Sequence, residues 1–185
     1  MKIIKSVAIT GHRPQDLYGF PKKLYESEEY NLLRARLRRV FVAAIEKNGT
    51  EEFIFGMALG TDQVALAVVI ELKSKYNIKL VAAVPFRGQE DAWSFPTRAL
   101  YACLLNKCDE IVYTDEMGGS SKLAGYDVSK LYARSKYMVQ RADGVIAVWN
   151  GKESGGTYDA VRLAKTAGKP VAIIDPRNLN GITRA

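Results

Sequence analysis

The strongest constraint on the fold is a regular alternation between two kinds of apolar segment. Six short segments are rich in β-branched residues and are bounded by Gly, Pro or Asp, which is typical of buried strands; they cover residues 5–10, 52–55, 79–84, 110–113, 144–149 and 170–174. Longer segments between them carry apolar residues at helical spacing, as in Leu33, Leu37, Val40, Phe41 and Ala44, and later in Val64, Ala67, Val68 and Leu72. Each helical segment is therefore expected to turn one apolar stripe toward a sheet.

This order of segments predicts an α/β fold. Neighbouring parallel strands need a crossover connection, which is usually a helix and is right-handed. Strands and helices that alternate at about 30 residues per unit therefore predict a mostly parallel sheet with helices on both faces. No internal repeat or linker interrupts the pattern, so we expect a single domain over residues 1–185.

Composition excludes several classes of protein. With 48% hydrophobic and 25% charged residues, the chain has the composition of a compact domain rather than of a disordered segment or a coiled coil. No apolar run approaches the ~18 residues of a membrane span. The chain begins directly with a strand pattern and shows no signal peptide. We therefore expect a cytoplasmic protein that does not contact the membrane.

The cysteines and the histidine argue against a metal site. His12 is the only histidine, and Cys103 and Cys108 lie five positions apart with no further cysteine near them. This spacing does not match a zinc site and is typical of reduced thiols, so neither a metal nor a cofactor is expected. A net charge of +7 predicts attraction to polyanions or to small phosphorylated ligands.

Glycines, cations and hydroxyls follow four of the predicted strands. Because the carboxyl ends of parallel strands meet at one edge of a sheet, we expect these loops to form one ligand site there. The candidate ligand-binding residues are Gly11, His12, Arg13, Gly56, Gly60, Thr61, Asp62, Pro85, Trp149, Ser154, Gly155, Gly156 and Thr157. His12 and Trp149 each allow two interpretations, since His12 either contacts a phosphate or base or is structural, and Trp149 either stacks on a base or packs in the rim.

Two of these loops open helices with glycines. Residues 56–62 and 154–157 each place Gly residues at a predicted helix start, where backbone N–H groups and the helix dipole attract phosphate. An acid follows in each case, Asp62 or Asp159, which suits a ribose hydroxyl or a helix cap better than bare phosphate. A structural turn also explains either loop taken singly. No P-loop and no G-x-G-x-x-G motif is present, which argues against ATP hydrolysis and dinucleotide oxidoreduction.

Two further segments have alternative interpretations. In the basic run 34–39, the buried positions Leu33, Leu37 and Val40 leave the arginines mostly on a solvated face, with nucleic-acid contact or oligomerisation as the alternatives. Residues 118–127 form a loop that either folds over a ligand or only connects two elements.

The motifs resemble those of the SLOG superfamily of Rossmann-like proteins, which includes the lonely-guy phosphoribohydrolases and the DNA-processing protein DprA. Within it the YpsA-type bacterial and phage proteins are the most similar, over nearly the full length. The matching segments are 9–14, 56–62, Pro85 and Phe86 with Trp93 downstream, and 142–144 before 154–157. The resemblance implies a Rossmann-like fold, a nucleotide or nucleotide-derived ligand, and a homodimer.

The hydrolytic branch of the superfamily is similar in part. Arg134, Met138, Ala142 and Asp143 match its Arg-x-x-x-Met and Ala-Asp spacing, whereas the acid expected three residues after Thr157 is replaced by Ala160, with a carboxylate only at Asp159. A shift of one position rotates a helical side chain by about 100°. The resemblance implies Arg134 and Asp159 as the catalytic residues of a hydrolase, and the displaced acid leaves enzymatic activity open.

Three functions follow from these observations. The first is binding of a nucleotide-derived ligand, either similar to ADP-ribose or NAD or a nucleoside phosphate, by a sensor, regulatory or sequestering protein. The second is a phosphoribohydrolase, which is an N-glycosidase acting on nucleoside monophosphates. The third is DprA-like DNA binding through residues 34–39; nucleic acid is the less favoured partner.

Overall fold

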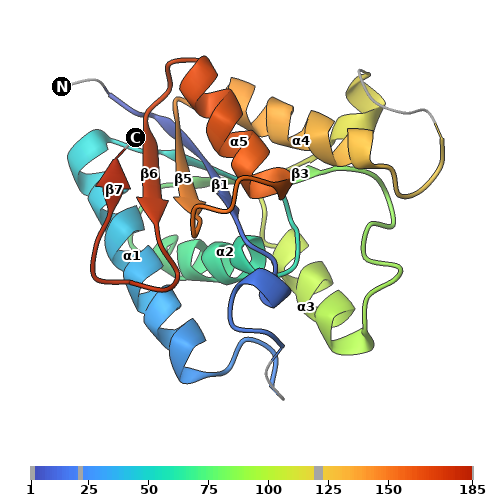
Figure 1. The fold of residues 1–185 in the computed structure, drawn as a ribbon, viewed down its shortest axis with the longest axis horizontal. Helices are drawn as coiled ribbons and strands as arrows, with labels where there is room; N and C mark the ends of the chain where they lie inside the picture. Colours follow the sequence, from blue (N-terminus) through green and yellow to red (C-terminus); the bar gives the residue numbers. More distant parts are fainter. Residues whose placement is uncertain (1–2, 21–22, 119–122, 185) are drawn as a thin grey trace.

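A seven-stranded sheet forms the centre of the protein (Figure 1). The computed structural model describes residues 3–20, 23–118 and 123–184. In the order β4-β3-β2-β1-β5-β6-β7, the strands are β4 (Glu110–Tyr113), β3 (Lys79–Val84), β2 (Glu52–Phe55), β1 (Ser6–Gly11), β5 (Gly144–Val148), β6 (Val171–Ile174) and β7 (Thr183–Arg184). The pairs from β4 to β6 are parallel and only β7 is antiparallel, which confirms the predicted fold class. The sequence pattern did not predict β7, because two residues show no periodicity.

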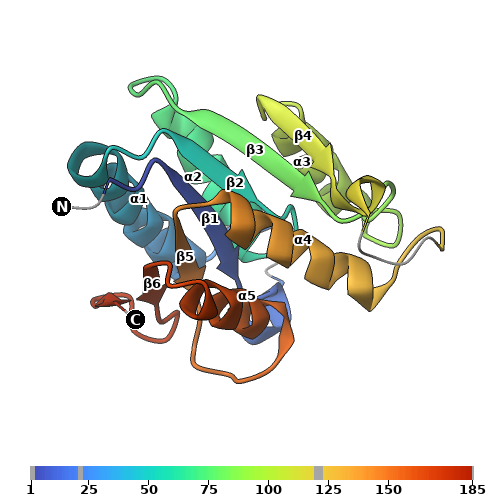
Figure 2. The ribbon, with the colours of Figure 1, turned by 90° about the horizontal axis from the view of Figure 1, so that it is seen from above.

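Helices cover both faces of the sheet (Figures 1 and 2). One core cluster packs α1 (Glu28–Asn48), α2 (Thr61–Leu72) and α3 (Phe95–Leu105) against one face, and a second packs α4 (Val128–Arg141) and α5 (Gly155–Thr166) against the other. Two short 3₁₀ helices, η1 (Pro14–Asp16) and η2 (Thr114–Met117), follow β1 and β4. The prediction of helices on both faces is confirmed.

The two faces of the sheet differ in the size of their side chains. Because side chains alternate along a strand, Phe53 and Phe55 of β2 point toward α1 and α2, whereas Ile54 points toward α4 and α5. On the α4 and α5 face, β1 and β3 contribute the small residues Ala8 and Ala83. This leaves room for long side chains of α4 beside the sheet.

Local signals place α1 where the sequence predicts it. The side chain of Ser27 accepts a hydrogen bond from the backbone N–H of Tyr30 at 3.4 Å and caps the amino end. Gly49, at φ 72°, ends the helix in the left-handed conformation. Its buried residues include the whole predicted stripe from Leu33 to Ala44.

Helix α2 is more buried than the predicted single stripe. Of the predicted positions, Val64, Val68 and Leu72 are buried but Ala67 is only partly so, and Leu66 and Val69, outside that stripe, are fully buried. The reason is tertiary packing, since α2 contacts the sheet as well as α1 and α3.

In the described part of the chain, no helix combines the length and the apolar character that crossing a bilayer requires.

Candidate ligand-binding pocket

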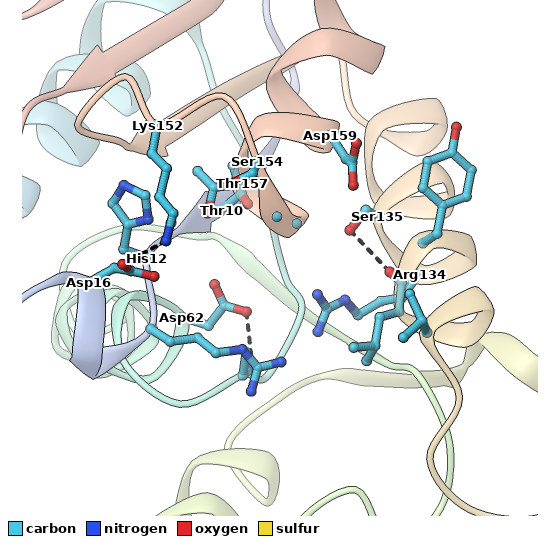
Figure 3. A pocket seen from close by; sticks show the side chains of 18 of the residues that line it. Thr10, His12, Asp16, Asp62, Arg134, Ser135, Lys152, Ser154, Thr157 and Asp159 are labelled. Carbon is cyan, nitrogen blue, oxygen red and sulfur yellow. Dashed lines mark hydrogen bonds and ion pairs between the residues drawn. The ribbon is translucent and has the colours of Figure 1, made fainter.

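A cavity of about 490 Å³ lies where β1 and β5 end (Figure 3). Its walls come from the loop between β1 and η1, the start of α2, the first turns of α4 and the loop between β5 and α5. The structure brings together in its lining these candidates from the sequence: Gly11, His12, Arg13, Asp62, Arg134, Ser154, Gly155, Gly156, Thr157 and Asp159. The candidates Gly56, Gly60, Thr61, Pro85 and Trp149 lie outside the lining.

Arg134 is the most deeply buried cation of the pocket. Helix α4 holds it with only 8% of its surface exposed, and its Nη1 donates a hydrogen bond to the carbonyl oxygen of Gly56 at 3.0 Å. Its Nε is buried and meets no acceptor among the described residues. A buried donor of this kind is normally paired, so the guanidinium retains binding capacity.

Gly56 supports this arrangement from behind the pocket. A Cβ atom at this position would lie 2.9 Å from Asp62 Oδ2 and 3.0 Å from Arg134 Nε. Such contacts are shorter than ordinary carbon contacts, so only glycine leaves room for both side chains. The effect of Gly56 on the pocket is therefore indirect.

Asp62 places a carboxyl group on the floor of the pocket. It is 5% exposed, and its Oδ2 accepts a hydrogen bond from the backbone N–H of Ala58 at 3.0 Å. Burial raises the pKa of this carboxyl group, and the charges of Arg134 and Arg13 oppose the rise without cancelling it. The pocket thus combines two guanidinium groups with an acid that holds its proton more strongly than usual.

The two glycine loops differ in what they offer a ligand. At the start of α2, the N–H of Gly60 donates to Tyr25 Oη at 2.8 Å and that of Thr61 donates to the carbonyl of His12 at 3.2 Å. At the start of α5, by contrast, no acceptor among the described residues takes a hydrogen bond from the N–H of Gly155 or Gly156, and Ser154 makes no side-chain cap. The amides of Gly155 and Gly156 are therefore available to an anion, whereas those of Gly60 and Thr61 are occupied.

His12 joins two of the loops. It is 5% exposed, and its ring Nε2 lies 2.8 Å from Asn150 Oδ1 and accepts from the backbone N–H of Asn150 at 3.1 Å. Burial lowers the pKa of the imidazole, which favours its neutral form. Of the two interpretations of His12, the geometry favours the structural one. Asn150 was not among the predicted residues.

Three other candidates are engaged inside the protein. The Thr61 hydroxyl donates to the carbonyl of His12 at 3.0 Å, and Pro85 is buried after β3. The indole Nε1 of Trp149 donates to the carbonyl of Lys152 at 2.9 Å, and its ring packs beside Tyr158 with centroids 6.4 Å apart. These contacts favour packing in the rim over base stacking for Trp149.

Several lining residues were not named individually as candidates. They are Thr10, Gln15, Asp16, Ala58, Tyr126, Val128, Leu131, Tyr132, Ser135 and Lys152. Leu131 lies three positions before Arg134 and Ser135 lies three positions before Met138, so helical spacing was a usable signal for both. The ion pair between Lys152 Nζ and Asp16 Oδ1, 3.0 Å long, joins distant segments and has no local signal. Of the loop 118–127, Tyr126 lines the pocket, and residues 119–122 lie outside the described part.

Asp159 faces the cavity from the first turns of α5 (Figure 3). Its side chain is 35% exposed, and its Oδ1 lies 3.7 Å from a guanidinium nitrogen of Arg162. The carboxylate is therefore accessible to a ligand although it sits one position away from the acid of the hydrolytic branch. Its catalytic role stays a prediction.

Asp143 lies at the other end of the sheet. Its Oδ2 accepts from the backbone N–H of Ser6 at 3.0 Å and from the Ser6 hydroxyl at 3.1 Å, where β5 and β1 begin. This residue therefore joins two strands and does not line the pocket.

Comparison with known proteins identifies a family and individual proteins that are similar to this chain over most of its length. The family model YpsA, described as the YspA SLOG family, matches residues 7–179. The chain is 34% identical over 138 residues to the uncharacterized SPbeta prophage-derived protein YoqJ of Bacillus subtilis, covering 72% of this chain and 80% of YoqJ. It is 26% identical over 167 residues to a UPF0398 protein of Bacillus thuringiensis, covering 90% of this chain and 85% of that protein.

Two solved structures share the fold. DNA processing protein A of Helicobacter pylori, whose structure was described for its single-stranded DNA binding mode, matches with a TM-score of 0.54 and 21% identity over 95% of this chain. DNA processing protein A of Streptococcus pneumoniae matches with a TM-score of 0.57 and 17% identity over 92% of this chain. This chain spans 66% and 50% of the length of those two chains.

Proposed function

This chain belongs to the YspA SLOG family, and from that membership and the geometry of its pocket we propose that it binds a nucleotide or nucleotide-derived ligand at the carboxyl edge of the sheet. The ligand is of the ADP-ribose or NAD type or is a nucleoside phosphate. The protein acts as a sensor, a regulator or a sequestering protein.

One observation carries the proposal. The free N–H groups at the start of α5 and the incompletely paired guanidinium of Arg134 face the same cavity, which Arg13 also lines. Helix amino ends and arginine forks are the groups that bind phosphate oxygens in proteins. A cavity of about 490 Å³ lies within the usual range of about 300–1,000 Å³ for small-molecule sites.

The remaining polar groups suit the sugar. Asp62 and Asp159 line the cavity as carboxyl groups, and Ser154 and Thr157 line it with hydroxyls. Carboxylates accept hydrogen bonds from ribose hydroxyls and repel a phosphate placed beside them. We therefore propose that the phosphate contacts Gly155, Gly156 and Arg134, and that the ribose hydroxyls contact Asp62 or Asp159.

The test is thermal unfolding with AMP, GMP, NAD and ADP-ribose. A ligand that binds only the folded state raises Tm by an amount that grows with the logarithm of its concentration once this exceeds Kd. Arg13→Ala is expected to weaken binding of the active ligand about tenfold, because a charge-assisted contact with phosphate is lost. Arg98→Ala, which removes an exposed arginine of α3 outside the pocket, is the matched control. No shift with any of the four ligands, or equal binding by Arg13→Ala and wild type, contradicts the proposal.

Hydrolysis of the N-glycosidic bond of nucleoside monophosphates is a second candidate. It is favoured by the position of Asp159, which faces the same cavity as Arg134 and Asp62. A carboxylate near the anomeric carbon stabilises the positive charge that develops on the ribose. Chromatography of AMP, GMP and CMP after incubation with the protein tests this. Free base formed by wild type and not by Asp159→Asn supports hydrolysis. If no free base forms, hydrolysis is rejected and ligand binding is the remaining function.

Binding of single-stranded DNA is the further alternative. It is favoured by the fold shared with the H. pylori protein and by the basic run 34–39 on α1. Retardation of an oligonucleotide that is lost when Arg34, Arg36, Arg38 and Arg39 are replaced by alanine supports it. Retardation that is unchanged in that variant argues against this surface.

A further inference from the structure

A separate cavity of about 480 Å³ lies between α1 and the loop that connects β6 to β7, drawn in red beside α1 in Figure 1. We propose that this cavity, here called the α1 groove, is a second site that binds a phosphate group carried on an apolar or planar body. None of the residues that line it lines the pocket at the carboxyl edge. The proposal is independent of the function assigned to that pocket.

The arginines of α1 divide into two pairs. Arg34 donates to Asn31 Oδ1 at 2.8 Å, and Arg38 forms an ion pair with Glu71. Arg36 and Arg39, three positions apart on one helix face, line the α1 groove and have no hydrogen-bond or ion-pair partner among the described residues. The two arginines that the fold leaves unused are thus the two that face the cavity.

Arg36 provides the strongest sign of an absent partner. Its Nε is buried and has no acceptor in the described part of the chain. A guanidinium carries five N–H donors in a planar fork that matches phosphate geometry. A phosphate oxygen in the groove would accept hydrogen bonds from the guanidinium of Arg36 and share its charge with Arg39.

The opposite wall is held in place by hydrogen bonds. Tyr18 Oη donates to the carbonyl of Pro176 at 2.6 Å, and Arg177 Nη2 donates to the carbonyl of Asn150 at 2.8 Å. The backbone N–H of Asn180 donates to Asn178 Oδ1 at 3.2 Å. Because the loop is fixed before a ligand arrives, less conformational entropy is lost on binding.

The composition of the groove limits the ligand class. Leu32, 54% exposed, and Ala35 add apolar surface beside the two arginines. Glu29 is the one acidic residue of the lining, and its carboxylate is hydrogen-bonded to Ser27, which lowers its pKa. Two unpaired guanidinium groups therefore face one engaged carboxylate, and a phosphomonoester or a nucleic-acid phosphate beside an apolar group fits better than a free inorganic ion.

The test uses amide NMR spectra of the ¹⁵N-labelled full chain titrated with phenyl phosphate. We expect saturable shifts of the amides of residues 35–39 and 177–180. Arg36→Gln combined with Arg39→Gln is expected to weaken the affinity at least about tenfold, because both charged contacts are lost. Arg34→Gln combined with Arg38→Gln removes the same charge from the same helix and is expected to change the affinity less than about twofold.

The outcomes separate the sources of the phosphate and the ways in which the proposal fails. If an oligothymidylate shifts the same amide signals and binds with higher affinity than phenyl phosphate, the source of the phosphate is a nucleic-acid strand. If only phenyl phosphate shifts these signals, the source is a small phosphomonoester. Three results would overturn the proposal: shifts confined to the amides of residues 154–157, shifts that do not saturate, or equal weakening of the affinity by the two double variants. Equal weakening would indicate attraction by net charge alone.

Discussion

At the scale of single residues, Gly56 decides whether Arg134 and Asp62 can lie side by side. We predict that Gly56→Ala lowers the free energy of unfolding by about 1–3 kcal/mol, because the new methyl group overpacks a filled site. The contacts that cause this are the 2.9 Å approach to Asp62 Oδ2 and the 3.0 Å approach to Arg134 Nε. Urea denaturation measures the free energy of unfolding, and the rise in Tm with the active ligand measures how well the pocket still binds that ligand.

Gly181→Ala is the matched control, because a Cβ at Gly181 meets nothing within 4 Å. It is expected to leave both the stability and ligand binding close to wild type. A Gly56→Ala protein that unfolds at the same urea concentration as Gly181→Ala would show that Arg134 and Asp62 move aside without cost.

Asp62 gives a pH prediction at the same scale. Its pKa is raised above the ordinary value of 3.8 by burial, so the folded state holds the proton more strongly than the unfolded state does. This contribution to stability is complete below the unfolded pKa and is lost as the pH rises through the folded pKa. We therefore predict that wild type loses stability relative to Asp62→Asn, which cannot ionise, as the pH rises above the ordinary carboxyl pKa of 3.8.

Urea denaturation of both proteins across that range is the measurement, and Asp91→Asn at an exposed position controls for the loss of a surface carboxylate. The informative quantity is the difference between variant and wild type at each pH, since the substitution also changes the surroundings of Arg134. A difference that stays constant with pH would contradict the assignment.

At the scale of elements, α4 is fixed at its carboxyl end by an ion-pair network while its other end lines the pocket. Arg141 donates to Glu52 and Glu110 at 2.6 to 2.9 Å, and Lys79 lies 2.6 Å from Glu110. These partners lower the pKa of Glu110 to about 2. The network therefore positions the helix that carries Arg134.

We predict that Glu110→Gln lowers the free energy of unfolding at pH 7 by about 1–2 kcal/mol, a figure reduced for solvent screening. Because the folded pKa is lowered, the contribution is present above the ordinary value of 4.5 and is lost as the pH falls toward about 2. The stability gap between wild type and variant should close over that interval in urea denaturation. A gap independent of pH would show that Glu110 acts through packing.

Elements also show what sequence patterns can and cannot predict. The six parallel strands were predictable because β-branched runs with Gly, Pro or Asp at their ends are local signals. The difference between the two glycine loops was not predictable, because the amide of Gly60 donates a hydrogen bond to Tyr25, which lies 35 positions earlier in the chain. The burial of α2 beyond the single predicted stripe likewise depends on its contacts with α1 and α3 and not on its own periodicity.

At the scale of the whole molecule, the topology explains why the pocket was predictable in outline. In a parallel sheet all carboxyl ends meet at one edge, so Gly11 and Gly155, far apart in the chain, both line one cavity. The position of Tyr132 on α4 was harder to predict from the sequence, since this residue lines the cavity only because the helix packs beside β1. The pairing of His12 with Asn150 depends on the alignment of β1 with β5, which no local pattern specifies.

The net charge of +7 leads to a prediction that separates a small ligand from a nucleic acid. A nucleotide that engages one phosphate group is expected to bind only a few times more weakly when KCl rises from about 50 to 500 mM, because few charges are screened. A single strand that contacts several phosphates releases counterions, so log K falls with a slope of about −0.7 per phosphate contact. Fluorescence titrations with labelled AMP and labelled oligothymidylate at four salt concentrations measure both slopes. A steep slope for the oligonucleotide together with no binding of AMP, GMP, NAD or ADP-ribose would replace the proposed small-molecule function by strand binding.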